Sequence, residues 1–103
     1  MSTPTKAEKE WMDAIAYFGC IVCHLAGHPG TPASVHHILS GGRRIDHLHT
    51  IPLCRGHHQY PERDSGKIAR HPNRAAFEAA YGTEAELLAK TKRLVSEQQR
   101  RAA

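Results

Sequence analysis

Near the N-terminal end of the chain, apolar residues recur at intervals of three and four among polar ones. This spacing predicts an amphipathic helix over about residues 6–18, with one face turned toward a core. Thr5 and Glu8 form the pattern of a capping box at its start, and Gly19 is expected to end it. The apolar positions that define the face are Trp11, Ile15 and Phe18.

The C-terminal third of the chain repeats this periodicity in two segments. Residues 73–81 are predicted to form a short helix that Gly82 closes. Thr83 and Glu86 then form a second capping box, which predicts a last helix over about residues 84–101. The apolar positions of that helix are Leu87, Leu88, Thr91, Leu94 and Val95.

The middle of the chain has the shorter pattern of strands. Residues 34–39 and 47–51 are predicted to be two short strands, and the two glycines at 41–42 mark a turn between them. The expected structure is a hairpin with Arg43 and Arg44 at a basic tip.

Turns and loops are expected around this hairpin. Pro52 should end the second strand, and residues 54–60 have room for one or two helical turns. Residues 20–23 are expected to form a tight turn, and the proline- and glycine-containing segment 61–72 a loop. A chain of 103 residues with these elements predicts a small single α+β domain.

Cysteines occur in a pattern typical of metal binding. Two pairs have the spacing that lets one turn offer two ligands to a tetrahedral Zn²⁺, so a structural Cys3His site is predicted at Cys20, Cys23, Cys54 and His57. Such a site would add folding free energy to a modest core. The simpler alternative is three inert buried cysteines and a chance histidine.

The first 18 residues interleave charged and apolar positions, so they lack the apolar core of a signal peptide. No apolar stretch reaches the length of a membrane span. The expected location is a reducing cytoplasm, where paired cysteines favour metal over disulfides.

Positive charge is concentrated in one segment of the chain. The net charge is +4, and residues 41–74 carry seven basic side chains against three acidic ones. This distribution favours a phosphate-bearing partner such as DNA, although a solvated surface would also account for it. The candidates for phosphate contacts are Arg43, Arg44 and Lys67.

Nine histidines are more than one structural zinc can use. Adjacent side chains on a strand point to opposite faces, so His36 and His37 are expected to do different work. One can bind a catalytic metal while the other accepts a proton from water, a combination suited to phosphodiester hydrolysis. Ordinary surface histidines are the alternative. The remaining candidates are His49 and His58.

These motifs together resemble the HNH, or ββα-metal, nuclease superfamily. The similarity extends over about residues 17–88 and includes the Cys-x2-Cys pair, the strand Ser34–Ile38 and the segment Ile51–Gln59. It further includes His71-Pro72 and the segment Phe77–Gly82, a combination that resembles the phage recombination-enhancement (Ref-type) nucleases. Some members of that group act together with a RecA filament.

The resemblance implies a role for each site residue. His37 matches the general base, His49 the residue that orients the base, and His36 and His58 ligands of a catalytic ion, expected to be Mg²⁺ or Mn²⁺. The four residues of the Cys3His group match the family's zinc site.

The chain departs from the family pattern at the third ligand of the catalytic ion. Many members place it four residues after the position of His58, where this chain has Glu62 directly after a proline. His71 is the preferred third ligand, with Glu62 as the alternative. His47 can replace His49 if the strand register differs.

The leading hypothesis is a metal-dependent endonuclease with an HNH core, acting on DNA with little sequence preference of its own. Its expected partners are DNA and a RecA-type filament, in the cytoplasm of a bacterium or phage-infected cell. The alternatives are a non-catalytic, zinc-stapled nucleic-acid-binding module and a zinc-organised protein adaptor. Strand breaks distinguish the first from the second, and DNA affinity distinguishes the second from the third.

Overall fold

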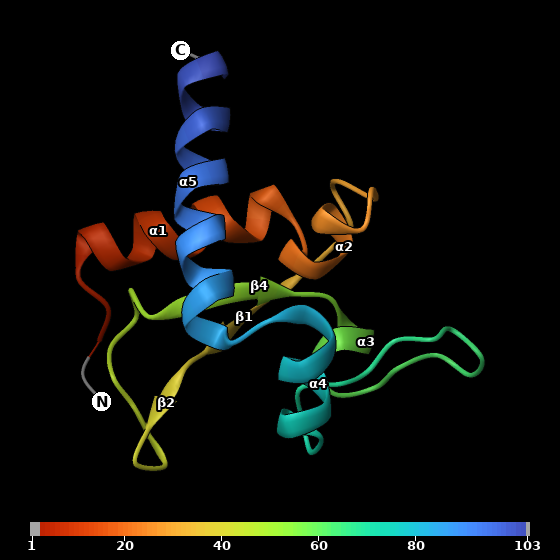
Figure 1. Cartoon of the computed structure of the whole chain (residues 1–103). Coiled ribbons are helices and arrows are strands. Elements are labelled where there is room, and N and C mark those ends of the chain that lie inside the picture. Colours follow the sequence, from red (N-terminus) through yellow and green to blue (C-terminus); the bar gives the residue numbers. More distant parts are fainter. Residues whose placement is uncertain (1–2, 103) are drawn as a thin grey trace.

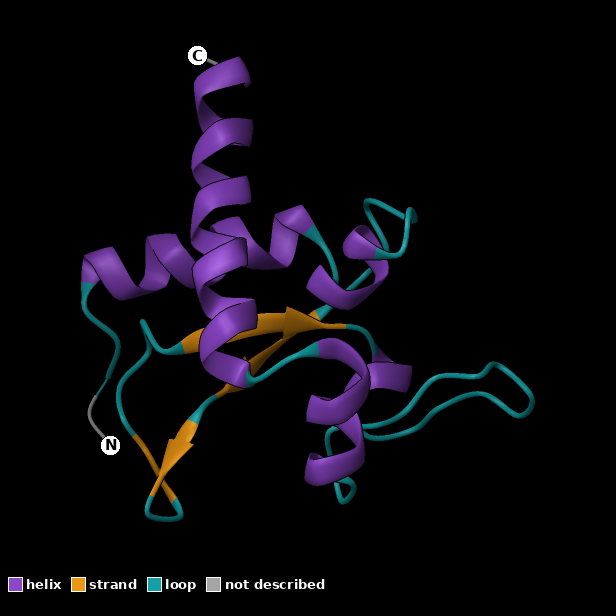
Figure 2. Cartoon of the chain, in the orientation of Figure 1, coloured by secondary structure: helices purple, strands orange, loops and turns teal. Residues whose placement is uncertain are grey.

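A computed structural model describes residues 3–102, which form short antiparallel strands covered by helices (Figure 1). The distribution of helix and strand is shown in Figure 2. In chain order the elements are α1 (Lys6–Phe18), α2 (Ile21–Leu25), β1 (Ser34–His37), β2 (Leu39–Ser40), β3 (Arg43–Arg44), β4 (Thr50–Leu53), α3 (Arg55–His58), α4 (Arg74–Tyr81) and α5 (Glu84–Ala102). The expected α+β class is confirmed.

The two longest helices begin at the capping boxes that the sequence contains. Thr5 and Glu8 exchange hydrogen bonds of 2.8 and 3.1 Å at the start of α1. Thr83 and Glu86 do the same at α5, at 2.9 and 3.1 Å. Gly19 ends α1 with a φ of 95°, a value that favours glycine.

The strands differ from the prediction in their bounds. The expected strand 34–39 is divided at Ile38 into β1 and β2, and β2 pairs with β3 in a separate small hairpin. The expected return strand does not begin at His47. Residues 46–49 turn instead, because the Asp46 carboxylate accepts the backbone N–H groups of Leu48 and His49, each at 2.8 Å.

The expectation that Pro52 ends its strand is also wrong. Pro52 lies inside β4, directly opposite Val35 of β1. The β1–β4 pair has only two strands, so a proline whose missing N–H would face away from the partner is tolerated. The register places His36 opposite Ile51 and His37 opposite Thr50.

The core lies between this strand pair and the helices. α1 and α5 both pack on β4, and α5 crosses α1 so that its last turns extend beyond the sheet (Figure 1). The Trp11 indole N–H donates to Thr50 Oγ1 at 3.0 Å, which fastens α1 to β4. The fully buried large side chains include Ile15, Ile21, Ile51, Leu53, Phe77, Leu87 and Val95.

Two short helices flank the sheet where the cysteines occur. The expected tight turn at 20–23 opens α2, and the expected helical turns after Cys54 are α3. The long loop that follows α3 returns to it through two backbone hydrogen bonds, from Arg70 N–H to His57 O and from His71 N–H to His58 O. None of the helices in residues 3–102 is long and apolar enough to cross a membrane.

Candidate metal centres

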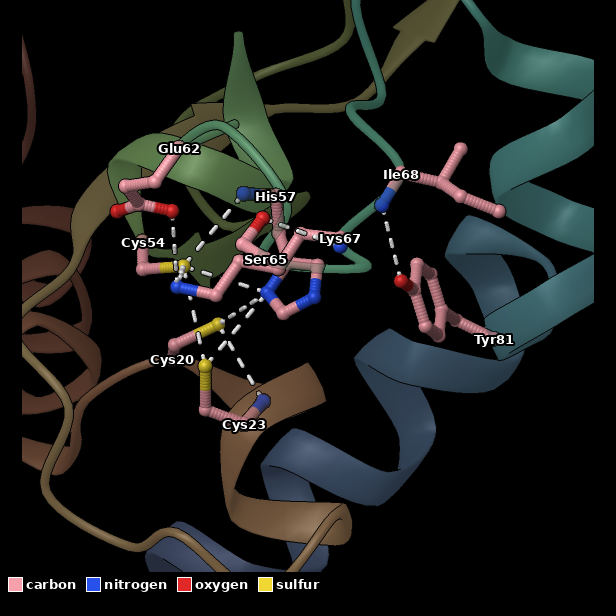
Figure 3. A network of polar contacts seen from close by, with 9 residues as sticks. All are labelled: Cys20, Cys23, Cys54, His57, Glu62, Ser65, Lys67, Ile68 and Tyr81. Atoms are coloured by element: carbon pink, nitrogen blue, oxygen red, sulfur yellow. Dashed lines mark hydrogen bonds and ion pairs between the residues drawn. The ribbon is translucent and has the colours of Figure 1, made fainter. Parts of the chain in front are cut away.

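The first candidate centre lies where α2 and α3 begin, and its side chains appear in Figure 3. The sulfurs of Cys20 and Cys54 accept hydrogen bonds from Cys23 N–H and His57 N–H, each at 3.5 Å, at the first turns of these helices. One helical turn therefore places Cys23 close to Cys20 and His57 close to Cys54. All four side chains are buried and converge on one point: Cys20, Cys23, Cys54 and His57.

Their spacing fits a tetrahedral zinc ion. Zinc–sulfur bonds of about 2.3 Å and zinc–nitrogen bonds of about 2.0 Å place two sulfurs about 3.8 Å apart and sulfur and nitrogen about 3.5 Å apart. The sulfurs of Cys23 and Cys54 are 3.8 Å apart. His57 Nδ1 lies 3.6 Å from the sulfur of Cys20 and of Cys23, and 3.2 Å from that of Cys54. This buried group can hold a structural zinc.

Protonation also suits this donor set. Burial lowers the pKa of His57 to about 4, so the imidazole is neutral at neutral pH and has a lone pair to offer. Burial raises the pKa of the Cys20 thiol to about 12 when no ion compensates its charge. Burial opposes ionisation of Cys54 as well, but hydrogen bonds from His57 N–H and its neighbouring thiols and the charge of Lys67 lower its pKa overall. A cation bound here would favour the thiolates.

Lys67, a candidate for DNA contact, lies against this cluster. Its Nζ is 3.8 Å from the sulfur of Cys54 and 3.4 Å from Glu62 Oε2, and its side chain is only 27% exposed (Figure 3). The absence of a side chain at Gly56 allows the approach, because a Cβ there would lie 2.7 Å from Lys67 Cδ. The structure thus places both Lys67 and Glu62 beside the cysteines.

The second candidate centre consists of three histidines. His36 comes from β1, His58 ends α3, and His71 comes from the returning loop. Their ring centroids are 5.1, 5.3 and 5.4 Å apart, and one nitrogen from each lies within 4.8 Å of the others. Of the two alternatives for a third ligand, the structure brings His71 to this group and turns Glu62 toward Lys67.

These imidazoles are suited to bind a divalent ion. Burial lowers the pKa of His58 to about 4, and the nearby imidazoles and Arg70 add to the effect. Burial and Arg70 also lower the pKa of His71. Both rings are therefore neutral at neutral pH, as metal ligation requires.

A buried carboxylate that the sequence interpretation did not single out joins this centre. Glu84, the first residue of α5, is 3% exposed, and its Oε2 lies 2.6 Å from Nε2 of His36. Arg70, itself buried, approaches the same oxygen at 3.3 Å. Burial raises the pKa of Glu84, but the hydrogen bond from His36 and the charge of Arg70 together have the larger effect. The net pKa is below the ordinary value, so the carboxyl is ionised at neutral pH. The sequence signal was a charged residue among otherwise apolar inward positions.

His37 lies on the other face of β1. Its Nε2 is 2.9 Å from Nδ1 of His47, and the two rings meet edge to face. Burial, the positive charge of Arg44 and the adjacent histidines lower the pKa of His37, so its ring is neutral at neutral pH. His36 and His37 thus contact different partners, as expected from strand geometry.

The structure does not bring His49, the residue matched to the orienting position, to His37. The His49 ring is turned to Asp46, with Nδ1 2.9 Å from the carboxylate, while His47 contacts His37. Because Asp46 holds residues 46–49 in a turn, His47 and not His49 contacts His37 of β1. The alternative register that the sequence left open, with His47 beside His37, is the one the structure has.

The two arginines of the expected basic tip form β3 and are exposed. Ile45 and Leu48, which follow them, are also partly exposed, at 46% and 42%. This hairpin projects from the body of the molecule below β1 in Figure 1.

Comparison with known protein families gives one match that extends over most of the chain. A family model described as recombination enhancement, RecA-dependent nuclease, matches residues 4–96. The matched region includes both candidate metal centres and α1 to most of α5. The chain belongs to this family of RecA-dependent nucleases.

Proposed function

We propose that this RecA-dependent nuclease family member is a metal-dependent endonuclease that hydrolyses DNA phosphodiester bonds with little sequence preference of its own. The observation that carries the proposal is the position of a neutral imidazole, His37, next in sequence to a three-histidine group. A hydrolytic site needs a proton acceptor and an electrophilic ion near one phosphate. β1 carries His37 as the proton acceptor and His36 as a ligand for the ion.

His36, His58 and His71 would hold the catalytic ion, which we propose to be Mg²⁺ or Mn²⁺. When bound, such an ion stabilises the negative charge that develops on the phosphate and on the leaving oxygen. Burial lowers the pKa of His58 and of His71, so their ring nitrogens need not lose a proton before they bind the ion.

His37 would act as the general base, and His47 would orient it. The contact between His37 Nε2 and His47 Nδ1 fixes the plane of the His37 ring and occupies one of its nitrogens. The other nitrogen remains to accept the proton of the attacking water. His49, whose ring contacts Asp46, is proposed to have no part in this step.

The exposed arginines Arg43 and Arg44 would contact the DNA backbone. Arginine binds phosphate oxygens through several N–H groups, which positions a duplex without reading its bases. Lys67 is proposed to serve the zinc cluster instead, because its amine is turned to Cys54 and Glu62. A RecA filament, the partner that the family description names, would supply the location of cleavage.

The proposal is tested by cleavage of plasmid DNA, either naked or paired with a RecA-coated homologous strand. Zinc-loaded protein is assayed with Mg²⁺, with Mn²⁺ and with no added divalent ion, because a chelator would also strip the Cys3His zinc. His71→Ala removes one proposed ligand. His28→Ala is the matched control, since His28 is exposed and lies outside both histidine groups.

We expect ion-dependent strand breaks with the unmodified protein and with His28→Ala, and their loss with His71→Ala. Equal cleavage without added ions, or by His71→Ala, would contradict the proposed ion site. DNA binding without breaks on either substrate would favour the alternative of a zinc-stapled binding module.

A further inference from the structure

The side chain of Glu84 is in an environment that a surface helix residue does not normally have. It begins α5, yet it is 3% exposed, and its carboxylate is directed at His36, a member of the three-histidine group. Oε2 meets His36 Nε2 at 2.6 Å, a short distance typical of a charge-assisted hydrogen bond. Glu84 itself is not one of the grouped ligands, so its contact with this centre is through His36.

The contact determines which ring nitrogen of His36 carries the proton. An ionised carboxylate can only accept a hydrogen bond, and an imidazole that ligates a metal has a single N–H, so in a ligating His36 that N–H is on Nε2. The lone pair is then on Nδ1, which is left for an ion. His36 is 3% exposed, so bulk water is excluded as a competing partner for either nitrogen.

Arg70 keeps the carboxylate in place. Its Nε lies 3.3 Å from the same Oε2, and its side chain is 7% exposed, so the two charges compensate each other out of water. The backbone N–H of Arg70 donates to His57 O, and that of the next residue, His71, donates to His58 O. One short segment therefore delivers both the partner of Glu84 and the third histidine.

We propose that Glu84 is a positioning residue: with Arg70 it holds His36 in the Nε2–H tautomer and so prepares the three-histidine group for a divalent ion. Carboxylates that accept the second N–H of a metal-ligating histidine fix its orientation and increase its basicity. This inference rests on the proposed ligand set of the nuclease, but its test does not involve DNA cleavage.

The test measures Mn²⁺ affinity by electron paramagnetic resonance of the free ion in zinc-loaded protein. Mn²⁺ is chosen because it is one of the two ions proposed for this group and because thiolates select zinc over it, so one equivalent of zinc is supplied for the Cys3His group. Glu84→Gln keeps the size of the side chain and removes its charge. Glu86→Gln is the matched control, since Glu86 lies in the same first turn of α5, is exposed, accepts a hydrogen bond from Thr83 N–H and is not part of the three-histidine group.

We expect Glu84→Gln to weaken Mn²⁺ binding by about 10–100-fold, the usual effect of losing such a partner, and Glu86→Gln to leave it unchanged. The melting temperature of each zinc-loaded variant is measured without Mn²⁺. An unchanged melting temperature shows that a loss of Mn²⁺ affinity is not caused by unfolding. Equal Mn²⁺ affinity in Glu84→Gln and in the unmodified protein would overturn the inference and leave the nuclease proposal intact. Failure of the unmodified protein to bind Mn²⁺ would overturn both.

A second measurement does not depend on how the variants fold. Long-range ¹H–¹⁵N correlation spectra of the unmodified, zinc-loaded protein without Mn²⁺ identify the tautomer of each histidine. The inference predicts that His36 carries its proton on Nε2. A proton on Nδ1 instead would contradict it, because the carboxylate of Glu84 would then face a lone pair.

Discussion

Lys67 shows how a single charged residue can be drawn from the surface to a buried cluster. A Cys3His site with zinc bound carries a net negative charge, and the amine of Lys67 lies 3.8 Å from the Cys54 sulfur. A donor of this kind stabilises a thiolate ligand by partly neutralising it. The same amine would be far less available to a phosphate.

We therefore expect Lys67→Met to weaken zinc binding by about tenfold or more, the usual cost of losing an outer partner of a metal site. Competition with a chromophoric chelator measures the zinc affinity. Lys90→Met serves as the control, because Lys90 is an exposed lysine on α5. If Lys67→Met keeps its zinc affinity but binds DNA more weakly than Lys90→Met, Lys67 contacts DNA phosphate and does not support the zinc site.

For single residues, the sequence predicts the candidate metal ligands better than the residues that support them. The Cys3His group follows from spacing alone, because two ligands three residues apart share a helical turn. Glu84 and Lys67 reach their sites through tertiary contacts across many residues, and no local spacing encodes them. His47, and not His49, lies beside His37 because the Asp46 turn sets the register of that segment.

The link from α1 to α2 is constrained by a close approach of two backbone segments. Gly19 has φ 95°, and a Cβ there would lie 2.8 Å from the backbone oxygen of Thr31. The neighbouring Cys20 N–H donates to that same oxygen at 2.9 Å. A side chain at residue 19 would disturb the loop next to Cys20, the first residue of the candidate zinc site.

We expect Gly19→Ala to lower the free energy of unfolding by about 1–3 kcal/mol from backbone strain, with a further loss from the clash. Gly30→Ala provides a comparison, since Gly30 also has a positive φ of 79° but has no atom within 4 Å of the added Cβ. Urea denaturation of both variants measures the difference. If Gly19→Ala loses no more free energy of unfolding than Gly30→Ala, the contact with the Thr31 oxygen does not destabilise the fold.

Glu8 connects α1 to the segment that carries His47. One carboxylate oxygen accepts Thr5 N–H at 2.8 Å, and the other accepts His47 N–H at 3.1 Å. These two hydrogen bonds, the first larger in effect, lower the pKa of Glu8 below its ordinary value of 4.5. A lowered pKa means that ionised Glu8 stabilises the folded state above pH 4.5 and that this contribution is lost on acidification.

Replacement of Glu8 by Gln should therefore reduce stability near neutral pH, and the difference from the unmodified protein should shrink as the pH falls below 4.5. Chemical denaturation at several pH values provides the measurement. Glu10→Gln, a change at an exposed position of the same helix, controls for net charge. A difference that is independent of pH would exclude the charge of Glu8 as its cause.

The sequence predicts the helices of this fold more closely than its strands. Both long helices start at capping boxes and have apolar faces, so local signals agree with the tertiary structure. β1 and β2 were expected as one strand, since nothing in residues 34–39 marks the break at Ile38. Short strands are determined by their pairing partners, and the pairing is not visible in the local sequence.

Across the whole molecule, the two candidate centres share one short helix. His57 faces the cysteines while His58, the next residue, faces His36 and His71. The loop that delivers His71 is bonded to the carbonyls of both histidines of α3. A zinc ion that fixes α3 would therefore also fix the geometry of the three-histidine group.

Removal of zinc should unfold the domain as a unit. Structural zinc contributes roughly 10–16 kcal/mol of apparent binding free energy in small domains, more than a modest core can replace. Circular dichroism during treatment with a strong chelator measures the loss of helix, and the same chelator saturated with zinc is the control. A helical signal unchanged after complete zinc removal would show that the core is sufficient alone.

The central claim is that His37 accepts the proton of the attacking water. Single-turnover cleavage by zinc-loaded protein with Mg²⁺ or Mn²⁺ tests it most directly, on DNA paired with a RecA-coated strand. We predict that His37→Ala lowers the rate by about 10²–10⁴, whereas His49→Ala, whose ring contacts Asp46, cleaves at nearly the unmodified rate. Cleavage by His37→Ala at the unmodified rate would contradict the account.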